Sequence, residues 1–375
     1  MRNFSRVGRI VVKLGTRVAV HPDGHANGEL LMPLCRQISE LRRSGRSVVV
    51  VSSGAVGLGR AALRPRGEES MAIKQALAAL GQVELMNVYK RIFELLNVMV
   101  AQVLLTRDDL NSRERYLNAR NTLNSLLQVG ILPIINENDS VSVEEIRFGD
   151  NDILAALVGG LVDADLVVNL TQTPGLLGPD RQVVPLVERI DREQYEWVDS
   201  TLSAGGTGGM ASKLEAARAA MGYGGRMIIA SAAEPDILTR LLAGEPLGTL
   251  FAAEGRRLTG KKRWLAASRA CRGTLRVDAG AARALTAHGK SLLAVGITAV
   301  EGDFKVGDLV AVYAPDGGEV GRGLCNLSAQ DLRQACGRAP SPGAEGSKGR
   351  TSPEVIHRDN LLIHRHPRHR EPSEC

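Results

Sequence analysis

The sequence predicts an α/β fold, a doubly wound and mostly parallel sheet, followed by a smaller, mostly-β domain. Over residues 1–258, short runs rich in Val and Ile alternate with segments whose apolar residues recur at helical spacing, as in a parallel sheet covered by helices. After residue 272 come short β segments separated by Gly302-Asp303, Gly307-Asp308 and Asp316-Gly317-Gly318, as in a small barrel. At 375 residues the chain is long enough for two domains.

The first domain is expected to alternate strands and helices from its start. The run 9–14 is apolar and β-branched, and the continuous apolar run 47–51 is typical of a strand buried on both faces of a parallel sheet. Strands are predicted at residues 9–14, 47–51, 98–105, 131–135, 166–170 and 226–230. Helices are predicted at residues 30–41, 71–96, 113–129, 153–161 and 214–221, and Gly45 ends the first of them.

The net charge of +6 lies in the C-terminal part of the chain. Residues 1–260 carry equal numbers of basic and acidic side chains, and then come Lys261, Lys262, Arg263, Arg269 and Arg272 with no acid among them. We interpret residues 259–272 as a basic linker between neutral domains rather than a surface that follows nucleic-acid phosphates. The aromatic content of 3% likewise argues against a platform for stacking bases.

The sequence lacks the patterns of a secreted or membrane protein. Its cysteines are scattered and form no Cys-x-x-Cys pair, which favours free thiols in a reducing compartment over zinc or disulfides. Lys13 interrupts the first apolar run, which therefore does not resemble a signal peptide, and the apolar run 153–162 is too short to span a bilayer. We therefore expect a cytoplasmic protein without a membrane segment.

A glycine-rich loop at residues 203–213 leads directly into the last predicted helix. Four of the five residues from Gly205 to Gly209 are glycine, and Lys213 adds a positive charge where the helix dipole and free backbone N–H groups favour an anion. This arrangement predicts a phosphate site, although a mobile surface linker would have a similar composition. The loop is not a Walker A motif, in which Lys directly follows Gly.

Polar residues stand at the ends of the predicted strands, where ligands bind in sheets of this kind. They are Lys13 with Gly15, Ser52-Ser53-Gly54, Asn136-Glu137-Asn138-Asp139 and, before an apolar helix, Gly149-Asp150-Asn151-Asp152. Taken singly, they allow other interpretations: a lysine at a sheet edge, a Ser-Gly helix cap, and an N-cap role for Asp152. Together with the glycine loop they form the set that phosphoryl transfer needs, and the absence of His from these motifs fits an acceptor carboxylate that is already ionised.

These motifs, in this order, resemble those of the amino acid kinase family. The matching segments are Val12-Lys13-Leu14-Gly15-Thr16, Ser52-Ser53-Gly54-Ala55, Leu117-Asn118-Ala119-Arg120, Ile135-Asn136-Glu137-Asn138-Asp139, Phe148-Gly149-Asp150-Asn151-Asp152 and Gly206-Thr207-Gly208-Gly209-Met210. The resemblance covers nearly the whole chain, because Lys262-Arg263-Trp264-Leu265 and Gly273-Thr274-Leu275-Arg276-Val277-Asp278 look like the junction with, and the start of, an appended PUA domain. It implies an amino acid kinase domain at 1–258 and a PUA-like barrel at 273–362.

The resemblance also implies a reaction, the transfer of a phosphoryl group from ATP, with Mg²⁺, to the side-chain carboxylate of L-glutamate, as in the first step of proline synthesis. Lys13 and Lys213 would hold the transferred group, and Asp152 would hold the lysines. The residues implied for glutamate are Ser53, Gly54, Asp139, Asp150 and Asn151. Those implied for the nucleotide are Lys13, Thr171, Gln172, Thr207, Gly208, Gly209, Met210, Ala211, Ser212 and Lys213. No dedicated set of protein ligands for a metal is expected, since Mg²⁺ is coordinated mainly by substrate phosphates and water.

The resemblance leaves partners and substrate choice open. It implies feedback inhibition by proline and a homo-oligomer, a dimer or tetramer. The alternatives are a kinase of the same fold for aspartate or acetylglutamate, and an RNA-binding PUA protein with a regulatory kinase-like half.

Two segments depart from the family pattern. Gln172 stands where the family usually has Asp, before a shortened turn at 174–180, and residues 337–353 resemble a flexible loop. Residues 363–375 are expected to form a disordered tail.

Overall fold

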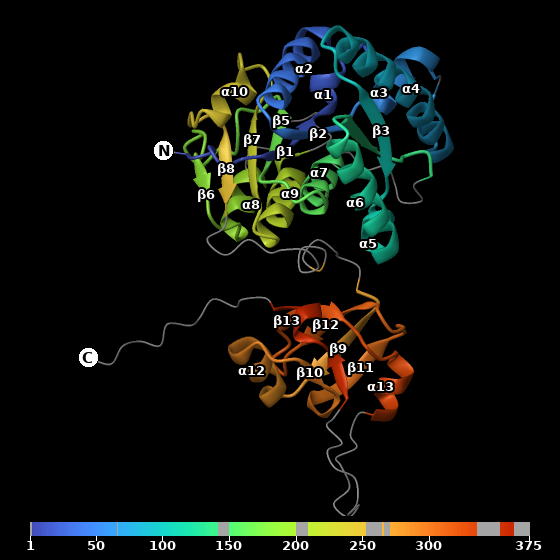
Figure 1. Cartoon of the computed structure of the whole chain (residues 1–375), viewed down its shortest axis with the longest axis vertical. Helices are drawn as coiled ribbons and strands as arrows, with labels where there is room; N and C mark the ends of the chain where they lie inside the picture. Colours follow the sequence, from blue (N-terminus) through green and yellow to red (C-terminus); the bar gives the residue numbers. More distant parts are fainter. Residues whose placement is uncertain are drawn as a thin grey trace, which may run out of the picture. The chain divides into compact units, whose positions relative to one another are not determined.

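A computed structural model describes residues 2–65, 67–141, 150–199, 209–252, 265, 271–335 and 353–363. The chain divides into two compact units, Met1–Leu258 and Thr259–Cys375 (Figure 1). The first unit is a sheet covered by helices on both faces, and the second is built mainly of short strands. The α/β prediction and the prediction of a mostly-β second part are both confirmed.

An eight-stranded sheet is the centre of the first unit, within the part of the chain that the structure describes. Its strands are β1 (Arg9–Leu14), β2 (Ser47–Ser52), β3 (Val100–Leu105), β4 (Leu132–Glu137), β5 (Leu166–Thr171), β6 (Leu186–Val187), β7 (Arg226–Ser231) and β8 (Thr249–Ala252). They lie in the order β3-β4-β2-β1-β5-β7-β8-β6, and β8 runs antiparallel to β7. The sheet is therefore mostly parallel, as predicted, whereas β6 and β8 were not foreseen.

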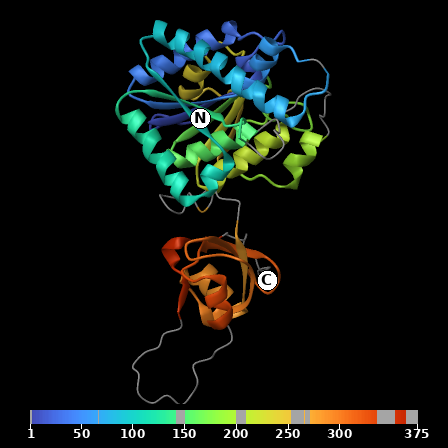
Figure 2. The same cartoon turned by 90° about the vertical axis from the view of Figure 1, so that its right-hand side faces the viewer.

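Helices cover both faces of this sheet (Figure 2). They are α1 (Thr16–Ala19), α2 (Gly28–Arg43), α3 (Ala55–Leu63), α4 (Met71–Leu95), α5 (Arg107–Asn111), α6 (Arg113–Gln128), α7 (Asp150–Leu161), α8 (Arg192–Asp199), α9 (Met210–Gly222) and α10 (Ile237–Leu242). Side-chain caps fix several starts: the Ser70 hydroxyl accepts from Ile73 N at the start of α4, and Thr106 and Asp109 form a capping box on α5.

One large hydrophobic cluster joins the sheet to α2, α4 and α10. Alternate strand residues such as Val12 and Val50 pack against Leu34 of α2 and Leu85 of α4 in this cluster. Each fully buried side chain of this size stabilises the fold by roughly 1.5–3 kcal/mol. The strands are therefore held rigidly, and so are the residues at their carboxyl ends.

The second unit contains two sheets, within its described residues. The larger has the order β11 (Ile297–Gly302), β9 (Gly273–Val277), β12 (Leu309–Tyr313), β13 (Glu319–Leu324) and β15 (Leu361–Ile363); the smaller pairs β10 (Leu292–Leu293) with β14 (Glu354–Ile356). Helices α12 (Ala279–His288) and α13 (Ala329–Ala335) complete it. Gly302, Gly307 and Gly317 take positive φ angles of 86°, 90° and 81°, at the turns that the sequence predicts.

Several sequence predictions fall on residues that the structure does not describe. These are most of the linker at 259–272, the loop at 337–352 and the tail at 364–375.

Among the helices that the structure describes, none is long and apolar enough to cross a bilayer. Cys35, Cys271 and Cys325 are free thiols, and burial raises the pKa of Cys35 to about 12, so that thiol is inert at neutral pH.

Candidate active site

The carboxyl ends of four neighbouring strands carry polar side chains at one edge of the main sheet. Lys13 is the next-to-last residue of β1, Asn169 pairs with it in register on β5, and Ser53 follows β2. Asn136 and Glu137 end β4. The chain places β2, β3 and β4 on one side of β1 and β5 on the other, which makes this edge a topological switch point, where ligands bind in open α/β sheets.

Two buried lysines share one buried carboxylate at this edge. Lys13 of β1, Asp152 of α7 and Lys213 of α9 are 5%, 0% and 6% exposed. Lys13 Nζ forms an ion pair with Asp152 Oδ1, and Lys213 Nζ lies 3.1 Å from Asp152 Oδ2. Ser212 Oγ donates to Oδ2 at 3.1 Å, and Asn169 Nδ2 donates to Oδ1 at 2.9 Å. We call Lys13, Asp152 and Lys213 the lysine–aspartate centre.

Burial and charge oppose each other in the lysine–aspartate centre. Burial by itself would raise the pKa of Asp152, but the charges of Lys13 and Lys213 and the hydrogen bonds from Lys13 and Asn169 hold that pKa at about 2. Burial lowers the pKa of Lys13; Lys213 acts in the same direction, and Asp152 opposes both. With two lysines against one carboxylate, the centre favours an additional anion.

The start of α9 and the turn after β1 leave this anion site open. Gly209 is the N-cap of α9 and supplies no side chain, so backbone N–H groups at the helix start are available to a ligand. A Cβ on Gly15 would lie 3.6 Å from Lys13 Nζ, in van der Waals contact, so Gly15 leaves that side of the ammonium group uncovered. Thr207 and Gly208 lie outside the described residues, and their predicted nucleotide role remains a prediction.

A pocket of about 230 Å³ lies beside β4 and α4; we call it the β4 pocket. Its lining includes Ala55, Gln82, Gln102, Glu137, Asn138 and Asp139. Ala55 of this lining directly follows the turn from β2 to α3. Gly54 lies in that turn and is the N-cap of α3, with a φ angle of 114°. A Cβ on Gly54 would come within 2.8 Å of Val20 Cγ2, so both the backbone conformation and the packing require glycine there.

Three amide side chains join the β4 pocket to the start of α7. Asn136 Nδ2 donates to Gln82 Oε1 at 2.7 Å, and Asn151 Nδ2 donates to Asn136 Oδ1 at 3.1 Å. The backbone N–H of Glu137 donates to the same Oδ1 at 2.9 Å. Asn136 and Gln82 are 3% and 8% exposed, so these bonds are shielded from water. We call Gln82, Asn136 and Asn151 the amide relay.

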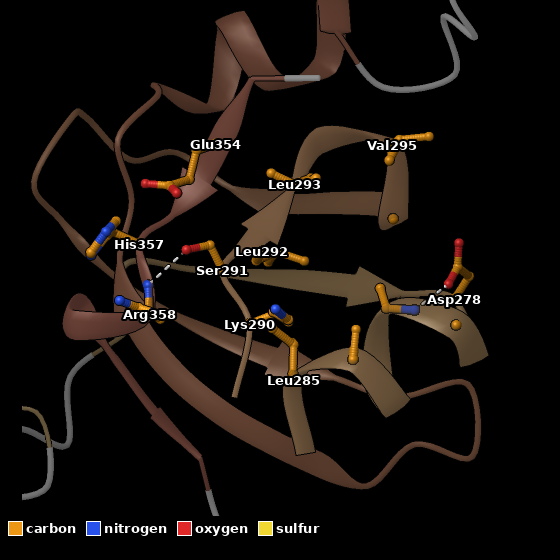
Figure 3. A pocket seen from close by; sticks show the side chains of 14 residues that line it. Asp278, Leu285, Lys290, Ser291, Leu292, Leu293, Val295, Glu354, His357 and Arg358 are labelled. Carbon is orange, nitrogen blue, oxygen red and sulfur yellow. Dashed lines mark hydrogen bonds between the residues drawn. The ribbon is translucent and has the colours of Figure 1, made fainter. Parts of the chain in front are cut away.

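A larger hollow, of about 720 Å³, lies within the second unit (Figure 3). Leu285 and Leu292 line its middle, His357 and Arg358 lie toward one end, and Asp278 lies at the other. Asp278 caps α12 by accepting from Ala281 N at 2.7 Å. The described residues that line this hollow include no buried group of lysines and carboxylates comparable to the lysine–aspartate centre, so we place the candidate active site in the first unit.

Most of the predicted site residues of the first unit come together at the sheet edge. Lys13, Asp152, Ser212 and Lys213 are in direct contact, and Asn151 joins the β4 pocket through Asn136. Two alternative interpretations were wrong. Lys13 is buried in a central strand rather than at an edge, and Asp152 lies inside α7, which begins at Asp150, rather than capping it.

The other predicted residues lie around this group. Ser53 and Gly54 follow β2, Asp139 lines the β4 pocket, and Thr171 ends β5. Gln172 is exposed, and its Oε1 accepts from Arg17 Nη1 at 3.3 Å. Met210 and Ala211 are the first residues of α9. For Asp150 only the backbone, at the start of α7, is described.

Sequence reasoning missed Asn169 and Gln82, and it left Asn136 out of the binding set. Asn169 is a polar residue inside the otherwise apolar strand β5, Leu166–Thr171, and its Oδ1 is buried without a hydrogen-bond partner among the described residues. Gln82 falls on the buried face of α4 with Leu77, Ala78 and Leu85. In both cases the signal is a polar residue at a position that the local pattern assigns to the core.

The sequence profile of the amino acid kinase family matches residues 8–231, and that of the PUA domain matches residues 273–340. Proteins named glutamate 5-kinase from Herpetosiphon aurantiacus and from Deinococcus radiodurans are each 46% identical to this chain, covering 94% and 95% of it and 98% and 99% of their own lengths. A glutamate 5-kinase from Moorella thermoacetica is 43% identical and covers 96% of this chain and 97% of its own length.

The chain belongs to the amino acid kinase family, whose profile spans strands β1 to β7 and both lysines of the centre, and it carries a PUA domain. Within that family its place is among the glutamate 5-kinases, since relatives of that name match it from end to end at more than 40% identity.

Proposed function

We propose that this protein transfers the γ-phosphoryl group of ATP to the side-chain carboxylate of L-glutamate, giving ADP and L-glutamyl 5-phosphate, the first step of proline biosynthesis. The observation that carries this proposal is the lysine–aspartate centre, which supports two buried cations beside the start of α9. Membership of the glutamate 5-kinases supports the choice of acceptor.

The centre acts by positioning and by charge. As the phosphoryl group leaves ADP, negative charge spreads over its oxygens, and fixed cations within a water-poor site stabilise that charge. Asp152 holds Lys13 and Lys213 in place, so the lysines need not reorganise during the reaction. The attacking carboxylate is already ionised at neutral pH, which explains why no general base is needed.

The β4 pocket and its neighbours are the proposed glutamate site. Asp139 lines the β4 pocket, and Asn151 is joined to β4 through Asn136. Ser53 and Gly54 follow β2, the strand that lies between β4 and the strand β1 that carries Lys13. Asp150 belongs to the same proposal through its backbone position at the start of α7. A carboxylate such as Asp139 suits the substrate ammonium group.

The proposed nucleotide site lies on the β5 side of the centre. Thr171 ends β5 and Gln172 follows it, whereas Gly209 caps α9 and Met210, Ala211 and Ser212 begin it beside Lys213. Thr207 and Gly208 complete the proposal from sequence alone. Free N–H groups at the start of a helix and a lysine one turn further on suit the phosphates of ATP.

Mg²⁺ fits this arrangement as a partner of the nucleotide. Among the described residues no cluster of three or more His, Cys, Asp or Glu side chains is placed to hold a metal ion. The unpartnered Asn169 Oδ1, next to Asp152, is an acceptor suited to a metal-bound water. When bound together with the nucleotide, Mg²⁺ would neutralise charge on the phosphates and would keep most of its own waters.

Four further proposals concern the setting of the enzyme. Proline, the end product of the pathway, is the expected feedback inhibitor, and the expected assembly is a homo-oligomer, a dimer or tetramer. The free thiols Cys35, Cys271 and Cys325 favour a cytoplasmic, reducing location. For the PUA domain we propose a regulatory or assembly role rather than RNA binding, because the charge of that part of the chain is balanced.

The proposal is tested by trapping the acyl phosphate with hydroxylamine in the presence of ATP and Mg²⁺. We expect hydroxamate from glutamate but not from aspartate, less of it when proline is added, and none from Lys213→Ala. Lys290→Ala, a lysine substitution in the second unit, is the matched control and should keep the wild-type rate. Hydroxamate from aspartate in preference to glutamate, or none from either, would contradict the proposal.

A further inference from the structure

The amide relay has a fixed direction, because it begins at a backbone group that can only donate. The N–H of Glu137 donates to one atom of the Asn136 amide, so that atom is the oxygen. Asn136 must then present its Nδ2 to Gln82, which accepts through Oε1 at 2.7 Å. The orientation of both amides therefore follows from the backbone rather than from the side chains themselves.

This direction leaves the other end of the Gln82 amide facing the β4 pocket. Oε1 is occupied by Asn136, and Gln82 lines the pocket. Its Nε2 has no partner among the described residues, yet it remains accessible, since it is not among their buried unpaired polar atoms. An amide nitrogen has two N–H donors and no acceptor, so the relay presents a pair of donors to whatever occupies the pocket.

The strand order indicates which end of an amino acid would meet these donors. The β4 pocket lies at β3 and β4, whereas Lys13 lies on β1, with β2 in between. Neighbouring strands are about 4.8 Å apart, so two steps separate the pocket from the lysine by about 10 Å. The carboxylate that reacts has to reach the lysines, and the other carboxylate of the same molecule then lies toward Gln82.

We propose that Gln82 is a specificity-determining residue, whose Nε2 donates to the α-carboxylate of the bound amino acid. The inference rests on the proposed function and deepens it, because it assigns a residue that selects the acceptor. A molecule held by its α-carboxylate at Gln82 reaches the lysines only if its side chain is long enough. Glutamate has one methylene more than aspartate. Because the position of the Gln82 donor is fixed, the longer side chain of glutamate reaches the lysines and the shorter side chain of aspartate does not.

The variant Gln82→Glu tests this assignment directly. Glu has the size of Gln and still accepts from Asn136, but it replaces the donors that face the pocket with a charged acceptor. We expect the KM for glutamate to rise on the order of 100-fold, since an interaction with a charged group is exchanged for repulsion. The KM for ATP should stay within about twofold, because the nucleotide lies on the other side of the centre.

Gln128→Glu is the matched control. Gln128 is the last residue of α6, its side chain is exposed, and it belongs neither to the β4 pocket lining nor to the relay, while the substitution adds the same charge. Its glutamate KM should change less than about fivefold, as expected for a solvent-screened charge. Equal rises in the two variants would overturn the assignment, since a general charge effect would then account for both.

A measurement on the wild-type enzyme does not depend on how a variant folds. 4-Aminobutyrate keeps the ammonium group and the reacting carboxylate of glutamate but lacks its α-carboxylate. We expect its kcat/KM to be lower than that of glutamate by on the order of 100-fold or more. Equal use of the two acceptors would overturn the role of Gln82 and leave the proposed function standing, whereas no product from glutamate would overturn both.

Discussion

The lysine–aspartate centre and the amide relay lie at the same sheet edge but are built on different physical principles. In the centre, full charges are buried and compensate one another: Asp152 is 0% exposed and contacts both lysines. In the relay, three neutral amides are oriented by one backbone N–H. Charge provides strength in the centre, whereas the direction of hydrogen bonds provides discrimination in the relay.

The difference has consequences for what each part tolerates. Removing one partner from a buried ion pair leaves an uncompensated charge and costs roughly 3–5 kcal/mol. Breaking one hydrogen bond between neutral amides costs about 1–3 kcal/mol, mainly through the group left unsatisfied. We therefore expect substitutions in the centre to abolish activity and those on the acceptor side to change substrate preference or stability.

The largest effect is expected from Asp152→Asn. The two lysines lose their shared anion, so kcat should fall on the order of 10³-fold, as when fixed charge stabilisation is removed from an active site. The free energy of unfolding should fall by about 3 kcal/mol. Hydroxamate assays and urea denaturation measure the two quantities.

Asp163→Asn is the control for this change, because Asp163 forms an ion pair with Arg120 at 2.7 Å but is partly exposed. It should cost less than about 1 kcal/mol and leave kcat unchanged. Similar losses in the two variants would show that burial of the centre has no special role.

A smaller effect, on stability, is expected from Gly54→Ala on the acceptor side. The φ angle of 114° and the 2.8 Å approach to Val20 Cγ2 should cost about 3 kcal/mol together. Gly28→Ala is the control, since a Cβ there meets nothing within 4 Å, and its melting temperature should be unchanged. A wild-type melting temperature for Gly54→Ala would refute the strained turn.

Asn169→Asp probes the boundary between charge and amide chemistry. A second carboxylate beside Asp152 would raise the pKa of that group above its present value of about 2, so the acid limb of the kcat profile should move to higher pH. At neutral pH we expect a loss of about 30-fold, because the new charge offsets one lysine. Asn169→Ala removes only the hydrogen bond that Asn169 donates to Asp152, so it should move the limb less than Asn169→Asp; equal displacement of the limb in the two variants would contradict this explanation.

The centre should also make stability depend on pH in the acid range. The folded pKa of Asp152, about 2, lies below its ordinary value of 3.8, so its contribution is present above about pH 4 and is lost as the pH falls toward 2. That contribution is about 2 kcal/mol. Urea denaturation between these pH values should show a flatter dependence for Asp152→Asn, and parallel curves would count against the ion pair.

The smallest effect is expected from Gln172→Asp, which restores the residue usual in the family. Gln172 is exposed and contacts Arg17, and Asp offers a shorter acceptor to the same partner. The KM for ATP should therefore change less than about threefold. A change above tenfold would show that this strand end, rather than α9, dominates nucleotide binding.

Local pattern was sufficient to find the elements that are long or strongly apolar. The strand prediction at 9–14 agrees with β1, and the prediction at 47–51 falls one residue short of β2. Both strands could be predicted because a continuous apolar run is typical of a strand that is buried on both faces of a parallel sheet. It was insufficient for β6, which has two residues, and for β8, whose pairing with β7 depends on long-range contacts. The strand β4 also extends to Glu137, so Asn136 lies inside the strand rather than after it.

The sequence by itself determined which chemistry is present: two lysines, an aspartate and a glycine-rich helix start, all recognisable because charges and glycines are rare inside apolar patterns. Only the tertiary structure decided how they act. Asp152 became the shared partner of Lys13 and Lys213 because α7 and α9 pack beside β1, and Gln82 gained a fixed donor because α4 packs next to Asn136. Ion pairs and amide orientation depend on distances of a few ångströms between segments far apart in the chain, and no local spacing encodes them.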